Sequence, residues 1–170
     1  MFKAHVLQKK GTQFPSSYSL SLFDNSLPSM YGLTPDLVST LDEIRTKKSH
    51  SQIAQELYAL FRGQIKYGSQ KKAQGYASAK QVWRNKEGVC GEMSYLYVSA
   101  ARYCGLRSSY VSVTEDYSGE SVHHACAAVW VPKMTLVDIA YNTYDIIHNS
   151  FSLRSDREVL HLYELWKVKK

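Results

Sequence analysis

The apolar residues of this chain change their spacing at Gly105, and this change limits the folds that the sequence can form. Before Gly105 they recur at three- and four-residue intervals, the spacing of amphipathic helices. After it, extended patterns run over 109–113, 122–131 and 134–141, with a turn-rich segment at 116–121 between the first two. The sequence therefore predicts a block of helices followed by antiparallel strands.

Start and stop signals bound the helices. Thr34 before Pro35 is a good N-cap followed by proline at the first helical position, and Gly105 is a typical helix stop. Residues 1–33, with a short alternating stretch at 18–23, are expected to be extended, and 68–77 to be an exposed loop. We expect helices within 35–66 (the second over about 51–61), then over 79–85, from Cys90 to Gly105, and over about 156–167, where Ser155 and Glu158 form a capping box.

The turn between the last two predicted strands sets which residues face each other. If 131–133 forms a three-residue loop, Trp130 lies opposite Met134. His124 and Asp138 are then diagonal neighbours on one face, roughly 7 to 8 Å apart along the backbone, which side chains can bridge. A loop one residue longer or shorter would separate them onto opposite faces.

Cys90 is the residue with the strongest chemical signal, because it stands at the predicted start of a helix. A helix N-terminus stabilises a thiolate through its unpaired N–H groups and its dipole. A nearby imidazole adds to this effect and can return a proton to the leaving group, and a third residue can orient the ring. We interpret Cys90, His124 and Asp138 as nucleophile, base and orienting residue.

Other interpretations of these residue types must be weighed. Cys104 and Cys126 are interpreted as small buried apolar side chains. His123 competes with His124, but neighbouring residues of a strand point to opposite faces, and the face shared with Asp138 favours His124. A zinc site of His123, His124, Cys126 and Cys90 would lack the close paired spacings of structural zinc sites, so no metal is expected.

The net charge of +6 comes from small groups of Lys and Arg spread along the 170 residues. Scattered charge of this kind usually serves solubility, and no nucleic-acid motif or membrane-spanning run accompanies it. The first ten residues lack the apolar core of a secretory signal, and three cysteines cannot form a fully paired disulfide framework. We expect one domain over 1–170, reduced thiols and a cytoplasmic location.

Several stretches resemble the core of the transglutaminase-like superfamily over roughly 57–143. The resemblance rests on the order Cys, His, Asp, each residue in a matching local context: 65–67, Ala79, Val82, Trp83, 86–92, 104–107, 110–113, His124-Ala125 and Val137-Asp138. One departure is Cys126, where many members have Trp after the His-Ala pair.

The resemblance implies an α+β fold similar to papain-like enzymes, with the nucleophile helix packed on an antiparallel sheet. It also implies acyl transfer through a thioester, without a cofactor, on a peptide, glutamine side chain or related amide. The backbone N–H of Cys90 would supply part of an oxyanion hole, and Trp83, Gln81 and Tyr67 are candidates for the second donor. The rival interpretation is a non-catalytic protein-interaction module on the same fold, binding a partner through its thirteen tyrosines and basic surface.

Overall fold

The computed structural model describes residues 5–6, 29–46, 48–68 and 77–168. The alternating stretch at 18–23 and most of the expected loop at 68–77 lie outside these residues. The elements in chain order are β1 (His5–Val6), the 3-10 turn η1 (Ser29–Tyr31), α1 (Pro35–Arg45), α2 (His50–Gln64), β2 (Lys66–Tyr67), α3 (Ala79–Asn85), β3 (Glu87–Gly88), α4 (Cys90–Tyr103), β4 (Ser108–Glu115), β5 (Ser121–Trp130), β6 (Met134–Asp138), β7 (Thr143–Tyr144), β8 (Ser150–Leu153) and α5 (Asp156–Val168).

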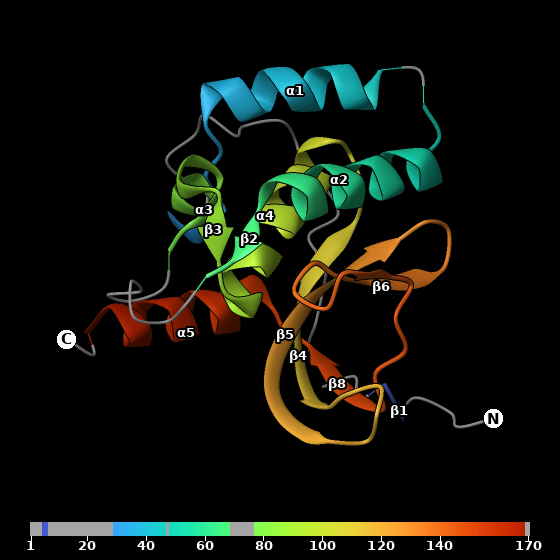
Figure 1. Ribbon diagram of the computed structural model, residues 1–170, viewed down its shortest axis with the longest axis vertical. Helices are drawn as coiled ribbons and strands as arrows, with labels where there is room; N and C mark the ends of the chain where they lie inside the picture. Colours follow the sequence, from blue (N-terminus) through green and yellow to red (C-terminus); the bar gives the residue numbers. More distant parts are fainter. Residues whose placement is uncertain (1–4, 7–28, 47, 69–76, 169–170) are drawn as a thin grey trace.

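Helices and sheet form separate groups, so the protein is α+β as expected. Figure 1 shows α1 to α4 together on one side of the molecule, the larger sheet on the other, and α5 crossing below α3. The sheet has the strand order β1-β8-β4-β5-β6-β7. It is antiparallel except that β1 pairs in parallel with β8, and a separate parallel ladder joins β2 to β3. No helix in the described ranges is both long and apolar enough to span a bilayer.

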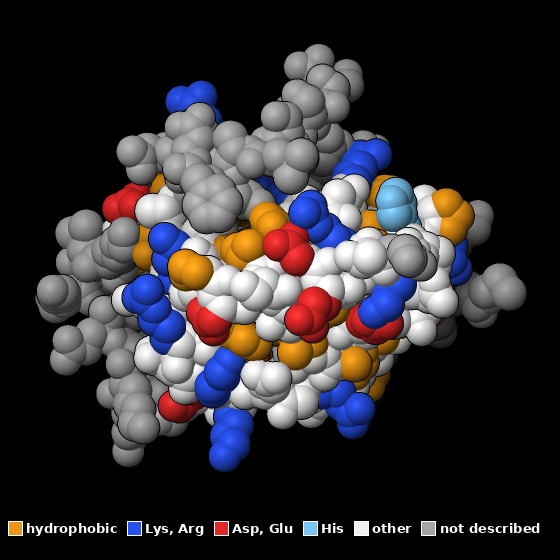
Figure 2. Space-filling model, turned by 90° about the horizontal axis from the view of Figure 1, so that it is seen from above, with side chains coloured by type: hydrophobic (Ala, Val, Ile, Leu, Met, Phe, Trp, Pro, Cys, Tyr) orange, Lys and Arg blue, Asp and Glu red, His pale blue; other side chains and the backbone are white. Residues whose placement is uncertain are grey.

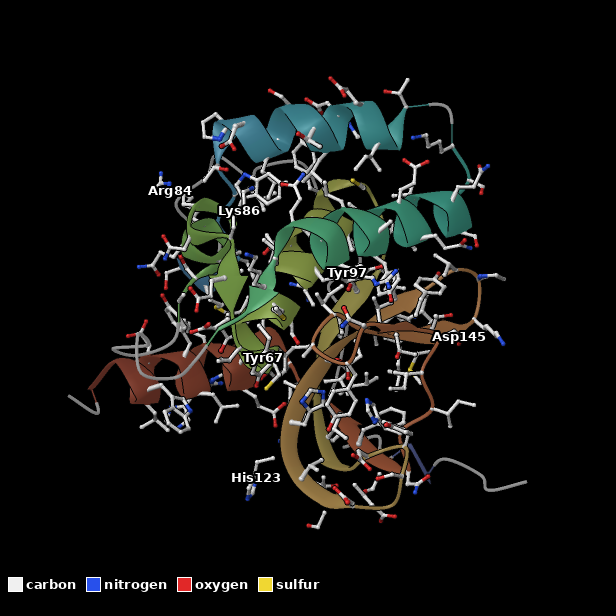
Figure 3. The ribbon with its side chains drawn as sticks, viewed as in Figure 1. Tyr67, Arg84, Lys86, Tyr97, His123 and Asp145 are labelled. Atoms are coloured by element: carbon white, nitrogen blue, oxygen red, sulfur yellow. The ribbon has the colours of Figure 1, made fainter. Side chains whose placement is uncertain are left out.

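Helix α4 lies at the centre of the fold. All of its residues after Cys90 are buried, although the sequence predicts only one apolar stripe. The helix packs on β5 and β4 on one side and on α2 and α3 on another, so its polar residues must find partners inside the protein. The Tyr97 hydroxyl, for example, donates to the carbonyl of Ala54 at 3.0 Å, which ties α4 to α2 (Figure 3).

The sheet has buried apolar residues on both faces. Ala125, Ala127 and Val129 of β5 belong to the core that contains α4. Cys126 and Ala128, which alternate with them, belong to a second cluster with residues of β4, β6 and β8. Ile146 belongs to this second cluster and Tyr141 packs against it, so the segment after β6 covers the face of the sheet that is turned away from α4.

The predicted hairpin register is confirmed, since Trp130 pairs with Met134 and Ala127 with Val137. The predicted strand 134–141 is too long, because β6 ends at Asp138 and the chain then turns through Asn142, whose φ is +50°. Strands β2, β3, β7 and β8 were not predicted. They are two to four residues long, too short to show an alternating pattern.

Helix ends follow the sequence signals closely. Helix α1 begins at Pro35, α3 spans the predicted residues, and Gly105 takes a φ of +83° just after α4. Helix α2 begins at His50, behind a capping box of Ser49 and Gln52, and continues to Gln64, beyond the predicted end at about residue 61. The box expected at Ser155 and Glu158 is present at the start of α5.

Arg102 and Asp156 join α4 to α5 through a two-pronged ion pair. Both Arg102 Nη to Asp156 Oδ distances are 2.9 Å, and Arg102 Nε donates to the carbonyl of Ser108. Asp156→Ala would leave the buried guanidinium without this partner, so we expect the free energy of unfolding to fall by about 2 to 3 kcal/mol. Urea denaturation measures this, with Glu56→Ala as control, because it breaks an exposed ion pair with Lys48 and should change stability by less than about 1 kcal/mol. An equal loss in both variants would contradict the expectation.

Candidate active site

Cys90 is the first residue of α4, as the sequence predicts. The turn before it is held by Glu92, whose carboxylate accepts the backbone N–H groups of Val89 at 2.8 Å and Ala77 at 2.7 Å. Burial raises the pKa of Glu92, and the two N–H groups oppose that rise. These contacts fix the direction in which the thiol leaves the helix start.

His124 comes from β5, at the point where this long strand bends. It pairs with Val113, and the β4–β5 register shifts between Val113 and Glu115, next to this pair. Its ring stacks on Tyr141 with centroids 4.3 Å apart and an angle of 15° between the planes. The bend and the stacked ring place the imidazole beside the Cys90 thiol, which lies within hydrogen-bonding reach.

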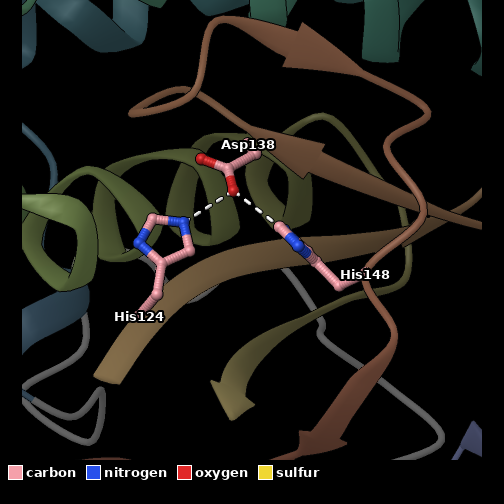
Figure 4. A group of neighbouring side chains, drawn as sticks. All are labelled: His124, Asp138 and His148. Carbon is pink, nitrogen blue, oxygen red and sulfur yellow. Dashed lines mark hydrogen bonds and ion pairs between the residues drawn. The ribbon is translucent and has the colours of Figure 1, made fainter. Parts of the chain in front are cut away.

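Asp138 lies at the end of β6 and is completely buried. Its Oδ2 is 2.7 Å from Nε2 of His124 and 3.0 Å from Nε2 of His148 (Figure 4). Its Oδ1 accepts the backbone N–H of Tyr141 at 2.9 Å. Nε2 of His124 is thus occupied by the carboxylate, which leaves Nδ1 as the ring atom available to the thiol.

The three groups change one another's proton affinity. Burial acts to raise the pKa of Cys90, but His124 and the backbone N–H groups of Ala125 and Gly91 outweigh it, and the pKa is lowered. Burial acts to lower the pKa of His124, but Asp138 and Cys90 raise it to about 9. The pKa of Asp138 is lowered because its contacts with both histidines outweigh burial. These shifts favour the thiolate–imidazolium form of the pair over its neutral form, relative to the isolated side chains.

The other histidine and cysteines considered as catalytic residues lie away from this site or are unsuited to it. His123 is exposed and points away from the sheet, on the other side of β5 (Figure 3). Cys104 and Cys126 are buried, as expected, and burial raises the pKa of Cys104 to about 12 and that of Cys126 well above its usual value. Neither thiol is prepared for nucleophilic attack.

The structure does not assemble the zinc set considered above. Within the described ranges, the one group of three side chains whose donor atoms could surround a cation is His124, Asp138 and His148, with those atoms within 4.8 Å of one another. Their hydrogen bonds already join the Nε2 and Oδ2 atoms that a cation would need. We therefore interpret the group as a hydrogen-bonded chain, in which His148 is a member that the sequence analysis missed.

Tyr67 is the candidate for second oxyanion donor that lies at the site. Its hydroxyl lies beside the backbone N–H and thiol of Cys90 although 59% of the residue is exposed, and partial burial together with the charge of the thiolate raises its pKa. Figure 3 shows it near the start of α4. The other two candidates have different partners, since Trp83 donates to Asp36 at 2.6 Å and Gln81 caps α3 with Ser78.

An open pocket of about 960 Å³ borders the site through Tyr141. The Tyr141 ring covers His124, and its hydroxyl lies 3.3 Å from Asp116 in the β4–β5 turn. The other lining residues are Tyr117, Ser118, Glu120, Thr143, Asp145, Ile146 and Ile147.

The surface charge is mixed on the face of the molecule seen in Figure 2. Acidic and basic side chains alternate there without a continuous area of one sign.

Comparisons with known proteins agree with this architecture. The family model of the transglutaminase-like superfamily matches residues 38–141, more than half of the chain. A crystal structure of a "putative cysteine protease" from Cytophaga hutchinsonii is similar over 72% of this chain, with 18% identity and a TM-score of 0.54. A "putative protease" from Parabacteroides distasonis matches over the same share with 11% identity, but its TM-score of 0.42 is too low to indicate a shared fold.

The chain spans 44% and 32% of the lengths of these two proteins. A search of curated proteins gave no match. The likeness to the Cytophaga protein shows a shared fold, and the family match over more than half of the chain carries the assignment. The chain belongs to the transglutaminase-like superfamily.

Proposed function

We propose that this protein is a thiol-dependent acyl hydrolase or acyltransferase that acts on a peptide, a glutamine side chain or a related amide. Cys90 is the nucleophile, His124 the base and acid, and Asp138 the residue that orients His124. The observation that carries the proposal is the placement of His124 between the Cys90 thiol and Asp138, with the pKa of Cys90 lowered and that of His124 raised to about 9.

The reaction proceeds in two halves. The Cys90 thiolate attacks the carbonyl carbon of the amide, and His124 gives its Nδ1 proton to the leaving nitrogen as the C–N bond breaks, which leaves a thioester. A water molecule or an amine then attacks the thioester carbon and gives its proton to His124. The C–S bond breaks, and the Cys90 thiolate returns.

Negative charge develops on the carbonyl oxygen in both halves. The backbone N–H of Cys90 and the hydroxyl of Tyr67 are the donors best placed to receive it. The N–H belongs to the start of α4, so its position is fixed by the helix. The two donors would thus meet the oxygen from different elements, α4 and β2.

Trapping of the acyl-enzyme tests the proposal. The protein is mixed with a p-nitrophenyl ester or a glutamine-containing peptide, quenched in acid and analysed by peptide mass spectrometry. We expect the acyl group on Cys90, none on Cys104 or Cys126, and none in Cys90→Ala. If Cys90 stays unmodified in the folded protein, the non-catalytic interaction module becomes the better account. Adding a primary amine to the same reaction separates hydrolysis from transamidation.

Tyr67→Phe is expected to lower kcat by about 10²-fold with little change in KM, because the oxyanion loses one donor only when it forms. Steady-state kinetics on the ester measures this. Gln81→Ala is the control, because it removes a capping side chain of α3 and should leave kcat unchanged at a temperature below its melting point. Equal kcat values for Tyr67→Phe and wild type would exclude this hydroxyl as the donor.

A further inference from the structure

A second histidine shares the carboxylate of Asp138. His148 lies between β7 and β8, is fully buried and places Nε2 3.0 Å from the same Oδ2 that contacts His124 (Figure 4). The carboxylate therefore has three partners: two imidazoles on Oδ2 and the Tyr141 N–H on Oδ1. The triad interpretation of the sequence uses only the first of them.

The proton of His148 is located by its partners. Oδ2 of Asp138 is an acceptor, so Nε2 must carry a hydrogen to bond with it. Nδ1 is buried without a hydrogen-bond partner among the described residues, and an N–H there would be a donor with no acceptor. The neutral tautomer with its hydrogen on Nε2 satisfies the carboxylate without a second buried N–H.

How strongly the Nε2–H of His148 stabilises the Asp138 carboxylate depends on whether His124 is charged or neutral. When His124 is an imidazolium, its charge compensates the buried carboxylate. When His124 is neutral, no cation lies beside the buried carboxylate of Asp138. Its hydrogen-bond donors are then the Nε2–H of His124, the Nε2–H of His148 and the backbone N–H of Tyr141. His148 therefore stabilises the state with neutral His124 more than the ion-paired state.

We propose that His148 is a positioning residue that keeps Asp138 ionised and aimed at Nε2 of His124 while His124 is neutral. This inference rests on the proposed function. Acylation starts from the thiolate–imidazolium pair, whereas thioester breakdown needs a neutral imidazole that takes a proton from water at Nδ1. By raising the share of acyl-enzyme in which His124 is neutral, His148 supports the second half of the reaction more than the first.

The other titratable groups around Cys90, His124 and Asp138 are the same in any variant of His148. They are Cys90 from α4, Tyr67 from β2, Cys126 on β5, Tyr141 after β6, and Asp116 behind the Tyr141 hydroxyl. A change that follows substitution of His148 alone therefore reports on the contact with Asp138.

Two substitutions separate the hydrogen bond from the volume of the side chain. In His148→Gln the side-chain amide places an N–H where Nε2–H stands, whereas His148→Leu keeps the bulk and removes the donor. His148→Asn is the second non-donating variant if the leucine protein is unfolded, since its amide corresponds to Nδ1 and falls short of Asp138. Thermal melts establish which variants fold.

Pre-steady-state kinetics with a p-nitrophenyl ester then measures each half of the reaction. For His148→Leu we expect the deacylation rate, measured below the pH at which His124 loses its proton, to fall about tenfold because less of the acyl-enzyme holds His124 neutral, while acylation by the ester stays within about threefold. His148→Gln should be within about threefold of wild type in both halves. The pH at which His124 loses its proton, followed by NMR, should rise in His148→Leu, because the neutral state is the one destabilised.

Equal losses in acylation and deacylation, or indistinguishable Leu and Gln variants, would overturn the role of His148 alone. A wild-type protein that forms no acyl-enzyme would overturn the proposed function, and this inference with it. The two failures are therefore distinguishable in the same experiment.

Discussion

Turnover is expected to fall about 10⁴-fold in His124→Ala. The substitution removes the group that takes and returns the proton, and it also removes the partner that lowers the pKa of Cys90. Both effects act on the chemical step, so kcat should carry most of the loss. Steady-state kinetics on the ester, with a thermal melt to show that the variant folds, measures this.

His123→Ala is the matched control for this variant. The two histidines are neighbours on β5, but His123 is exposed and points away from the site (Figure 3). Its removal should leave turnover within about twofold of wild type, as for most surface substitutions. A folded His124→Ala protein with full activity would show that the base is wrongly assigned, and His123 would be the next residue to test.

Asp138→Asn is expected to lower kcat by about 10³-fold, somewhat less than the ~10⁴-fold known for the equivalent change in a serine protease. An amide can donate to Nε2 of His124, and this favours the tautomer with a hydrogen on Nδ1, which cannot act as a base toward the substrate. The loss should be smaller here because the Cys90 thiolate also stabilises the imidazolium. The same kinetic assay measures it.

Glu43→Gln provides the control for the change from carboxylate to amide. Glu43 is exposed on α1 and does not line the pocket beside the site. Its activity should match wild type. If Asp138→Asn retained wild-type kcat while melting normally, Asp138 would have a structural role only.

The contact between His124 and Asp138 could be predicted because it depends on local signals. Pro132 favours a loop in its hairpin, the three-residue loop sets the register, and the register places the two residues on one face. Cys90 was located in the same way, by the glycines around it and the helical spacing that follows. In both cases the residues that determine the structure, the hairpin loop and the helix start, are close together in the sequence.

His148 could not be found by such reasoning. It lies outside any predicted element, and what gives it a partner is the return of the chain from β7 to β8, which closes one face of the sheet. The full burial of α4 was missed for a related reason, because its polar side chains are satisfied by distant elements, as Arg102 is by Asp156. Pairing of this kind depends on tertiary structure and leaves no periodic pattern.

The pH dependence of alkylation tests most directly whether Cys90 is held as a thiolate by His124. At pH 6 an ordinary thiol with a pKa of about 8.5 is below ~1% thiolate. With limiting iodoacetamide and peptide mass spectrometry, Cys90 should react first, and its rate should reach half of its plateau well below pH 8.5. In His124→Ala the midpoint should move up toward or beyond that of an ordinary thiol. A wild-type midpoint at pH 8.5 or above, or earlier labelling of Cys104 or Cys126, would contradict the account.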